Sequence, residues 1–355
     1  MRDGSPPPST TGATRRASVG VVAIGRNEGE RLRRCLEAVG GAAGCVVYVD
    51  SGSTDGSVGL ARALGAGVVE LDPRTPFSPG RARNEGFRRL GELLPNVRYV
   101  QFVDGDCEIA AGWLAEAAAF LDEHQEVAVV AGRRRELHPE RSVYNLLCAV
   151  EWELHPVGEA AACGGDALMR VDAFAASGGY RVELMGGEEP DLCQRLRAAG
   201  WRIWLLRRVM TLHDAAMTRF SQWWRRNVRS GYAGVQRAWL YGVPRGEHGV
   251  REVLGTFFWA ALLPVAIAVA TIAVSPWCAL LLLAYVLQVA KLALQGRRRT
   301  PSSWRAMSWY AAFLVMAKLP KLVGYVRFLT GRLLGSAPRL IEYKSVTHGP
   351  KAPRV

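Results

Sequence analysis

The sequence predicts an α/β fold with helices on both faces of a parallel sheet, followed by a part that associates with a membrane. Between residues 19 and 206, short β-branched runs alternate with stretches rich in Arg, Glu and Ala, which is typical of a doubly wound sheet. Residues 253–290 contain no charged residue. Residues 1–200 hold 22 Lys and Arg against 28 Asp and Glu, whereas residues 201–355 hold 23 against 4. This asymmetry indicates an acidic body and a basic tail that faces an anionic surface.

The strands and helices of the sheet domain are expected in regular alternation. Strands are expected at 19–24, 46–49, 68–71, 98–103 and 127–131, and helices at 28–39, 56–65, 79–92 and 110–123. The strand segments are rich in valine and isoleucine, which favour strands. In such sheets ligands bind beyond the carboxyl ends of the strands, so the segments that follow the strands are where we expect a site.

Polar motifs stand at these strand ends or at the start of the next helix. They are Gly25-Arg26-Asn27-Glu28, the segments 50–56 and 80–86, and Asp104-Gly105-Asp106. Taken singly, segment 50–56 also suits a helix cap and turn, and the charges of 80–86 suit a solvated helix face. Four such motifs converging on one sheet edge indicate a binding site.

Asp104 and Asp106 indicate a metal at this site. They follow the apolar run 99–103, so the two carboxylates stand where a buried strand opens into a loop. Hard ions such as Mg²⁺ or Mn²⁺ take few carboxylates and bridge phosphates through their remaining positions. The alternative is an ordinary acidic turn.

Together the motifs resemble those of family 2 glycosyltransferases. The resemblance rests on residues 24–28, VDSGSTDGS (49–57), GRARNEG (80–86), FVDGDCEI (102–109), GGDALMR (164–170) and GGEEPDLCQRLRAAG (186–200). It extends over residues 18–230 and implies a Rossmann-like nucleotide-diphospho-sugar transferase domain, called GT-A. It also implies a nucleotide-sugar donor, Mn²⁺ or Mg²⁺ as cofactor, and inversion at the anomeric carbon.

The resemblance assigns roles around the donor. The donor-binding residues it implies are Asn27, Glu28, Asp50, Arg83, Asn84 and Asp104, and the metal ligands are Asp104, Asp106 and His213. For His213 a structural role is the alternative. The chain departs from the family pattern at Ser51, where relatives carry a second Asp, and this leaves the preferred base open.

The general base is expected at the start of a helix. Relatives use the Asp of a Glu-Asp pair, which here reads Glu188-Glu189. The resemblance therefore implies Glu189 as the base, with Glu188 or Asp191 as alternatives. The competing interpretation is that these carboxylates favour the helix N-terminus through its dipole, with Asp191 pairing with Arg195.

Two further segments are assigned to the acceptor. Gly164, Gly165 and Asp166 are expected on the acceptor side, since glycine permits close approach of the backbone to a substrate. Gln222, Trp223 and Arg225 lie in a segment that resembles the Gln-x-x-Arg-Trp motif of processive polysaccharide synthases, although Arg226 replaces its Trp. We expect this Trp- and Arg-rich helix at the membrane surface.

Two membrane helices are predicted at about 254–274 and 277–295. At ~1.5 Å per residue each approaches the ~30 Å of a bilayer core. Arg297, Arg298 and Arg299 follow directly, and by the positive-inside rule this loop and the catalytic domain face the cytoplasm. The alternative is a buried hairpin in a soluble core. Two spans are too few for a translocation channel, so we do not expect processive synthesis.

The expected organisation has five parts: a disordered tail without a signal peptide (1–17), a catalytic domain (18–230), an amphipathic connection (231–253), a transmembrane hairpin (254–295) and a basic C-terminal part (296–355). The last part contains either an interfacial helix broken at Pro320 or a third crossing. Seven scattered Cys without zinc spacing suggest reduced thiols.

The leading hypothesis is a glycosyltransferase of the cytoplasmic membrane that uses a lipid-linked acceptor in cell-surface glycan or exopolysaccharide assembly. The alternatives are a protein or soluble glycan acceptor, or a non-catalytic nucleotide-binding scaffold. A nucleic-acid partner is not expected, because the positive charges flank apolar spans. The sugar, the base and the oligomeric state are left open.

Overall fold

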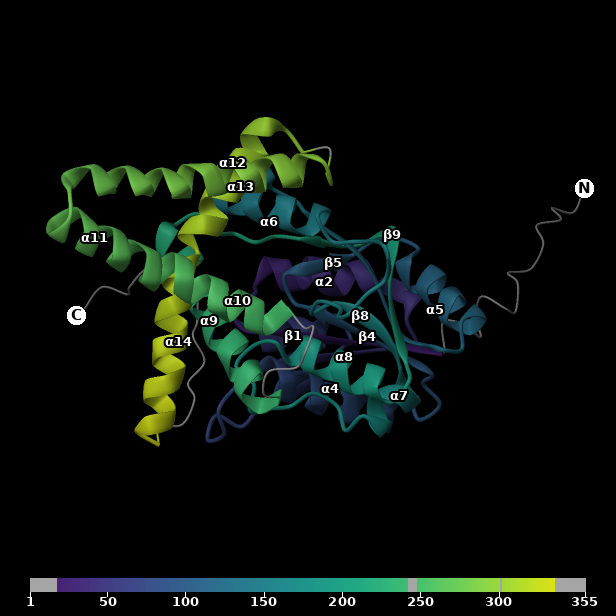
Figure 1. Cartoon of the computed structure of the whole chain (residues 1–355). Coiled ribbons are helices and arrows are strands. Elements are labelled where there is room, and N and C mark those ends of the chain that lie inside the picture. Colours follow the sequence, from purple (N-terminus) through teal and green to yellow (C-terminus); the bar gives the residue numbers. More distant parts are fainter. Residues whose placement is uncertain (1–17, 242–247, 301, 336–355) are drawn as a thin grey trace, which may run out of the picture. The chain divides into compact units, whose positions relative to one another are not determined.

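The computed structural model describes residues 18–241, 248–300 and 302–335 (Figure 1). The predicted tail 1–17 and residues 336–355 lie outside this range. The described residues form two units. The first contains 18–137, 156–182 and 188–214, and the second contains 138–155, 183–187 and the described residues from 215 onward.

The first unit is built on one sheet with the strand order β3-β2-β1-β4-β8-β6-β9-β5, and β7 pairs with β9. The strands are β1 (Val19–Gly25), β2 (Cys45–Asp50), β3 (Gly67–Glu70), β4 (Tyr99–Asp104), β5 (Cys107–Ile109), β6 (Val127–Glu136), β7 (Gly158–Glu159), β8 (Ala167–Arg170) and β9 (Arg202–His213). The first four run parallel, as predicted.

The rest of the sheet corrects the expectation of a wholly parallel arrangement. β8 is antiparallel to both β4 and β6, and β5 is antiparallel to β9, whereas β6 and β9 are parallel. The prediction extended the strand-helix alternation of the first 131 residues to the whole sheet. Because β8 runs against β4, its first residue Ala167 pairs with Phe102. The loop that precedes β8 therefore lies at the carboxyl end of β4, beside the acidic pair.

Helices cover both faces of the sheet. They are α2 (Glu30–Val39), α3 (Ser57–Ala63), α4 (Pro79–Leu93), α5 (Trp113–Glu123), α7 (Val171–Ala176) and α8 (Glu188–Ala198), with the short turn η1 (Gly40–Ala42). In Figure 1, α2 lies above strands β1 and β4, α4 and α7 lie below them, and α5 lies at the right. A Cβ atom on Gly86 would lie 2.3 Å from Val22 Cγ1. Glycine is therefore needed where α4 packs on β1, and this close packing fixes α4, which carries Arg83.

The second unit is helical. Its elements are η2 (Pro139–Arg141), α6 (Val143–Glu153), α9 (Phe220–Tyr241), α10 (His248–Phe257), η3 (Phe258–Leu262), α11 (Leu263–Ala273), η4 (Pro276–Leu282), α12 (Leu283–Arg297), α13 (Trp304–Met316) and α14 (Lys318–Leu333). α9 and α14 touch backbone to backbone, since a Cβ on Gly231 would lie 2.3 Å from Lys321 O. The helix break comes at Ala317, and Pro320 sits in the first turn of α14, where its missing N–H costs no helical hydrogen bond.

Two continuous helical stretches are candidate membrane spans. Val250–Ala273 has 24 residues and Pro276–Arg297 has 22, with mean hydropathies of 2.2 and 2.0. Little of either stretch is buried, and Ile272 and Trp277 are 88% and 79% exposed. This exposure argues against a buried hairpin in a soluble core. The two helices predicted at 254–274 and 277–295 are confirmed as helices.

Candidate functional site

The guanidinium of Arg83 joins the acidic pair to the start of α8. Arg83 is buried in α4, and its Nη2 lies 3.0 Å from Asp104 Oδ1. Its Nη1 lies 2.9 Å from Glu188 Oε1 and 3.1 Å from Glu189 Oε1. Burial acts to lower the pKa of Arg83, but Glu189 and Asp104 outweigh it and raise the pKa well above its usual value. Arg83 is therefore a permanent cation shared by three carboxylates.

Glu189 differs from its neighbour Glu188 in exposure and in proton affinity. The Glu189 side chain is 15% exposed and that of Glu188 is 2% exposed. Burial, followed by the negative charge of Glu188, raises the pKa of Glu189 to about 7. A partly accessible carboxylate with a pKa near neutrality is suited to accept a proton from a substrate hydroxyl.

Asp191 forms ion pairs with a residue of α8 and with a residue of the preceding loop. Its carboxylate is fully buried and lies 2.7 Å from Arg195 Nη2 and 3.4 Å from Arg181 Nε. The pairing with Arg195 that the sequence suggested is confirmed. Arg195 also donates to the carbonyl of Gly179, so Asp191 fastens α8 to the loop before it.

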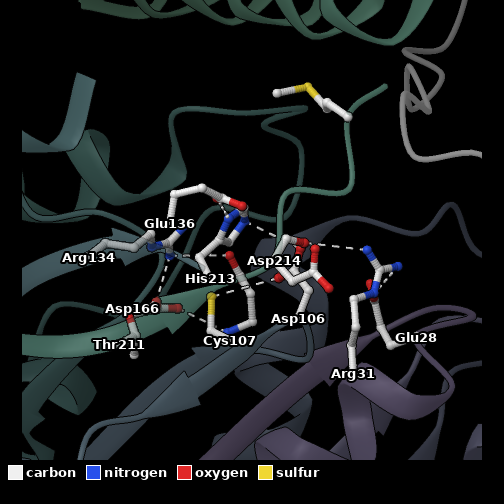
Figure 2. A network of polar contacts seen from close by, with 12 residues as sticks. Glu28, Arg31, Asp106, Cys107, Arg134, Glu136, Asp166, Thr211, His213 and Asp214 are labelled. Atoms are coloured by element: carbon white, nitrogen blue, oxygen red, sulfur yellow. Dashed lines mark hydrogen bonds and ion pairs between the residues drawn. The ribbon is translucent and has the colours of Figure 1, made fainter. Parts of the chain in front are cut away.

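A second cluster forms where β5, β6 and β9 meet, and Figure 2 shows His213 between two carboxylates. His213 Nε2 lies 3.4 Å from Asp106 Oδ2, and Nδ1 lies 3.0 Å from Glu136 Oε2. Burial acts to lower the pKa of His213, but Asp106 and then Glu136 raise it overall. Glu136 was not found from the sequence, because the β6–β9 register that places it opposite His213 joins residues far apart in the chain.

The donor atoms of this cluster fit a divalent cation. One oxygen of Asp106, the Cys107 thiol and a nitrogen of His213 lie within 4.8 Å of one another. A bond from Nδ1–H to Glu136 leaves the lone pair of His213 Nε2 directed at the Asp106 side, as in many metal sites. Burial raises the pKa of Cys107 well above its usual value, so this group is a neutral thiol, a poor ligand for a hard ion. The fitting ligands are therefore Asp106 and His213.

Asp166 holds the acidic pair in place from the side of β8. Its Oδ1 accepts the backbone N–H of Asp104 at 3.0 Å, and its Oδ2 accepts the hydroxyl of Thr211 at 2.7 Å. Arg134 Nη2 lies 2.7 Å from Asp166 Oδ2 (Figure 2). The same nitrogen lies 3.5 Å from Asp104 Oδ2. Asp166 was expected on the acceptor side, but its buried carboxylate positions Asp104.

The two glycines before Asp166 differ in the space that a side chain would have. A Cβ on Gly165 would lie 2.6 Å from Arg83 Nη2 and 3.1 Å from Asp104 Oδ2. Among the described residues, no atom lies within 4 Å of the corresponding position on Gly164. Gly165 is therefore required by the packing of the Arg83 cluster, and Gly164 is not.

The expected donor-binding residues at β1 and β2 hold two loops together. Asp50 is buried and accepts bonds from the Tyr48 hydroxyl at 2.9 Å and from the backbone of Gly52 and Ser53 at 2.9 and 2.7 Å. Asn27 has a left-handed φ of 55°, and its side-chain oxygen accepts the N–H of Thr54 at 2.7 Å. These contacts fix the loop edge at which a donor is expected.

Glu28 and Asn84 have structural contacts of the same kind. Glu28 forms an ion pair with Arg31 at 2.7 Å, and Arg31 reaches the carbonyl of Asp214 at 3.5 Å (Figure 2). Asn84 donates to the carbonyl of Tyr180 at 2.8 Å and accepts its N–H at 2.9 Å. Direct donor contacts of these residues stay predictions.

The expected acceptor residues of α9 belong to the second unit. Gln222 accepts the N–H groups of Thr218 and Arg219 at 2.9 and 3.0 Å, so it caps the start of α9. Trp223 is buried, whereas Arg225 is exposed. The side chain that pairs with an acid of the same unit is Arg226, 2.9 Å from Glu151.

The sheet and the helices on its two faces define a fold of GT-A type. A comparison with family models matches residues 20–176 to Glycosyl transferase family 2. Residues 20–176 thus match the model of that family, which confirms the resemblance noted in the sequence for this part of the chain.

Individual relatives agree with this assignment. The succinoglycan biosynthesis protein ExoA of Rhizobium meliloti (strain 1021) is 28% identical over 266 residues, which cover 70% of this chain and 77% of that protein. The mannosyltransferase PcManGT of Pyrobaculum calidifontis, solved with GDP-Man and Mn²⁺, has a TM-score of 0.59 at 20% identity and covers 88% of this chain and 87% of its own. At that identity the structural likeness shows the fold.

Proposed function

We propose that this protein is a membrane-anchored, metal-dependent inverting glycosyltransferase that moves a sugar from a nucleotide-sugar donor to a lipid-linked acceptor. The observation that carries the proposal is the Arg83 bridge, which holds Asp104 and Glu189 on one guanidinium. The carboxylate suited to deprotonate an acceptor thus lies next to the acidic pair suited to the donor diphosphate. The presence of GDP-Man and Mn²⁺ in the PcManGT structure supports this assignment.

In the proposed reaction Glu189 takes the proton of the acceptor hydroxyl. The acceptor oxygen forms a bond to the anomeric carbon, and the bond from that carbon to the diphosphate breaks, which inverts the configuration. The nucleoside diphosphate leaves with the bonding electrons. A divalent cation, Mn²⁺ or Mg²⁺, on Asp106 and His213, with Asp104 beside it, would neutralise the charge of this leaving group. Arg83 keeps Glu188 and Glu189 close together despite their like charge.

The membrane part of the proposal rests on the candidate spans. Their exposed apolar residues need a nonpolar environment. Arg297, Arg298 and Arg299 lie at the end of the second span and directly after it. By the positive-inside rule these arginines face the cytoplasm, together with the catalytic unit. An anchored enzyme suits a lipid-linked acceptor, and the relative named for succinoglycan biosynthesis supports a role in exopolysaccharide assembly.

The proposal is tested with the full chain in detergent. Release of nucleotide from UDP-, GDP- and dTDP-sugars is measured with Mn²⁺, Mg²⁺ or EDTA, with and without a polyprenyl phosphate. We expect release that requires metal and that the lipid stimulates. Metal-dependent transfer to soluble glycan or protein in place of lipid would overturn the acceptor assignment. Absence of turnover with every donor would overturn the enzyme and leave the scaffold alternative.

A further inference from the structure

The second unit contains a cavity of about 160 Å³ among α6, α9, α13 and α14. This is roughly ten times the ~15 Å³ that a single water needs. Side chains from all four helices line the cavity. α9 contributes Trp223, Arg226 and Asn227, spaced as neighbours on a helix surface, and Lys321 comes from α14.

One part of the cavity lining is polar and charged. The charged groups in its lining are Arg226, Lys321 and Glu151. Arg226 Nη2 lies 2.9 Å from Glu151 Oε2, with 32% and 38% of the two side chains still exposed. Arg226 and Lys321 lower the pKa of Glu151 against the effect of burial, so the pair is ionised at neutral pH. Lys321 also forms an ion pair with Glu252 of α10, which lies outside the lining. The cavity thus holds two basic side chains that an anionic ligand can share with their carboxylate partners.

Another part of the lining is apolar. Leu147, Phe313 and Leu314 line it, and the ring of Trp223 meets that of Phe313 edge to face at 5.0 Å. A pocket with apolar walls and a few convergent polar groups is typical of a ligand site. An ion pair in such a setting adds little to stability compared with apolar packing, so its presence requires another reason.

The helices around the cavity pack on a candidate membrane span. Val150 of α6 and Met307 and Ala311 of α13 form one buried cluster with Ala293 of α12. Two of the helices that line the cavity, α6 and α13, therefore also pack on a helix that is expected to be in contact with lipid.

We propose that this cavity binds an amphiphilic phosphate ester, with the phosphate at Arg226 and Lys321 and the hydrocarbon chain against Leu147, Phe313 and Leu314. The lipid-linked acceptor and an anionic phospholipid of the bilayer both have this chemistry. Only the identification of the ligand as the acceptor rests on the proposed function. The existence of the binding site is independent of that function.

The test measures binding to the full chain in detergent micelles without any sugar donor. Farnesyl phosphate is the probe, farnesol tests the chain alone, and inorganic phosphate tests the head group alone. Bound molecules are counted by native mass spectrometry across a titration. We expect farnesyl phosphate to bind at least about tenfold more tightly than either partial ligand. Equal binding of farnesol and farnesyl phosphate would overturn the proposal.

Variants locate the site. Lys321→Gln, and separately the double variant Arg226→Gln with Glu151→Gln, should each weaken farnesyl phosphate binding about tenfold. The double variant removes both charges of the ion pair and leaves no buried ion unpaired. The matched control is Arg327→Gln, which removes an exposed cation from the same helix α14 and should bind as the parent does. Unchanged affinity in both pocket variants would overturn the assignment.

A further comparison distinguishes the two sources of the ligand. Dioctanoyl phosphatidylglycerol that binds as tightly as farnesyl phosphate would support the cavity as a phospholipid site. Binding about tenfold weaker than that of farnesyl phosphate would support the acceptor lipid. Because no donor is present, a failure of glycosyl transfer does not affect this measurement.

Discussion

Two carboxylate clusters at the edge of the sheet differ in the cation that they share. In the first, Asp104, Glu188 and Glu189 surround Arg83, whose charge is permanent. In the second, Asp106 and Glu136 flank His213, whose charge depends on a proton. A guanidinium cannot be deprotonated in a protein, whereas an imidazole can exchange its proton for a metal ion.

This difference indicates how one sheet edge serves two purposes. The Arg83 cluster is a fixed support, suited to hold a base in position through a reaction. The His213 cluster can gain and lose a cation, suited to bind a metal together with a diphosphate. The acidic pair spans both, since Asp104 belongs to the first cluster and Asp106 to the second.

The largest effect is expected for Glu189→Gln, which breaks the first cluster at the proposed base. The amide keeps the size of the side chain but cannot accept the proton, so kcat should fall about a thousandfold. Donor binding, measured as the Kd of the nucleotide-sugar with Mn²⁺, should stay within about threefold, because the second cluster is intact. The matched variant Glu123→Gln, at an exposed position on α5, should leave kcat unchanged. Near-normal kcat for Glu189→Gln would exclude it as the base.

The second prediction separates the clusters by metal affinity. Asp106→Asn should weaken Mn²⁺ binding about a hundredfold and reduce turnover with it, because it removes the proposed anionic ligand. Mn²⁺ binding is followed directly by electron paramagnetic resonance of the free ion. Glu188→Gln, in the first cluster, should not weaken it. An equal loss in both variants would show that the clusters act as one metal site.

A smaller effect is expected at Glu136, which touches His213 but is not a proposed ligand. Glu136→Gln should weaken Mn²⁺ binding about tenfold, since partners of a ligating histidine typically have effects of this order. Cys107→Ser should change the Mn²⁺ affinity by less than about twofold, because the thiol is a poor partner for a hard ion. A loss at Cys107 larger than that at Glu136 would indicate a thiolate ligand instead.

The sequence predicted the first cluster better than the second. Asp104 follows an apolar strand and Glu189 opens a helix, so local patterns marked both. Glu136 and Arg134 were missed because they lie in β6 beyond residue 131, where consecutive arginines looked like the end of the strand. The pairing of β6 with β9 places Glu136 opposite His213, and Arg134 reaches Asp166 before β8. Such nonlocal contacts are not visible in one sequence.

The same limit applies to Asp166. Its two preceding glycines suggested close approach of the backbone to an acceptor, and the antiparallel direction of β8 brings the Asp166 carboxylate to the backbone of Asp104. The sequence predicted four parallel strands correctly because a helical pattern separates each of them from the next. It could not indicate the direction of β8, whose preceding segment carries no such pattern.

The smallest effect concerns pH and tests the link between Arg83 and Glu189. Because Glu189 acts as a base only when ionised and its pKa is about 7, kcat/KM should fall about tenfold per pH unit below 7 and level off above it. The charge of Arg83 acts to lower this pKa. In Arg83→Lys the compact ammonium cannot hold Asp104 and both glutamates as the planar guanidinium does, so the acid limb should move to higher pH by about one unit. A limb that stays in place, with kcat reduced equally at all pH values, would show that Arg83 supports the fold of the site without tuning its base.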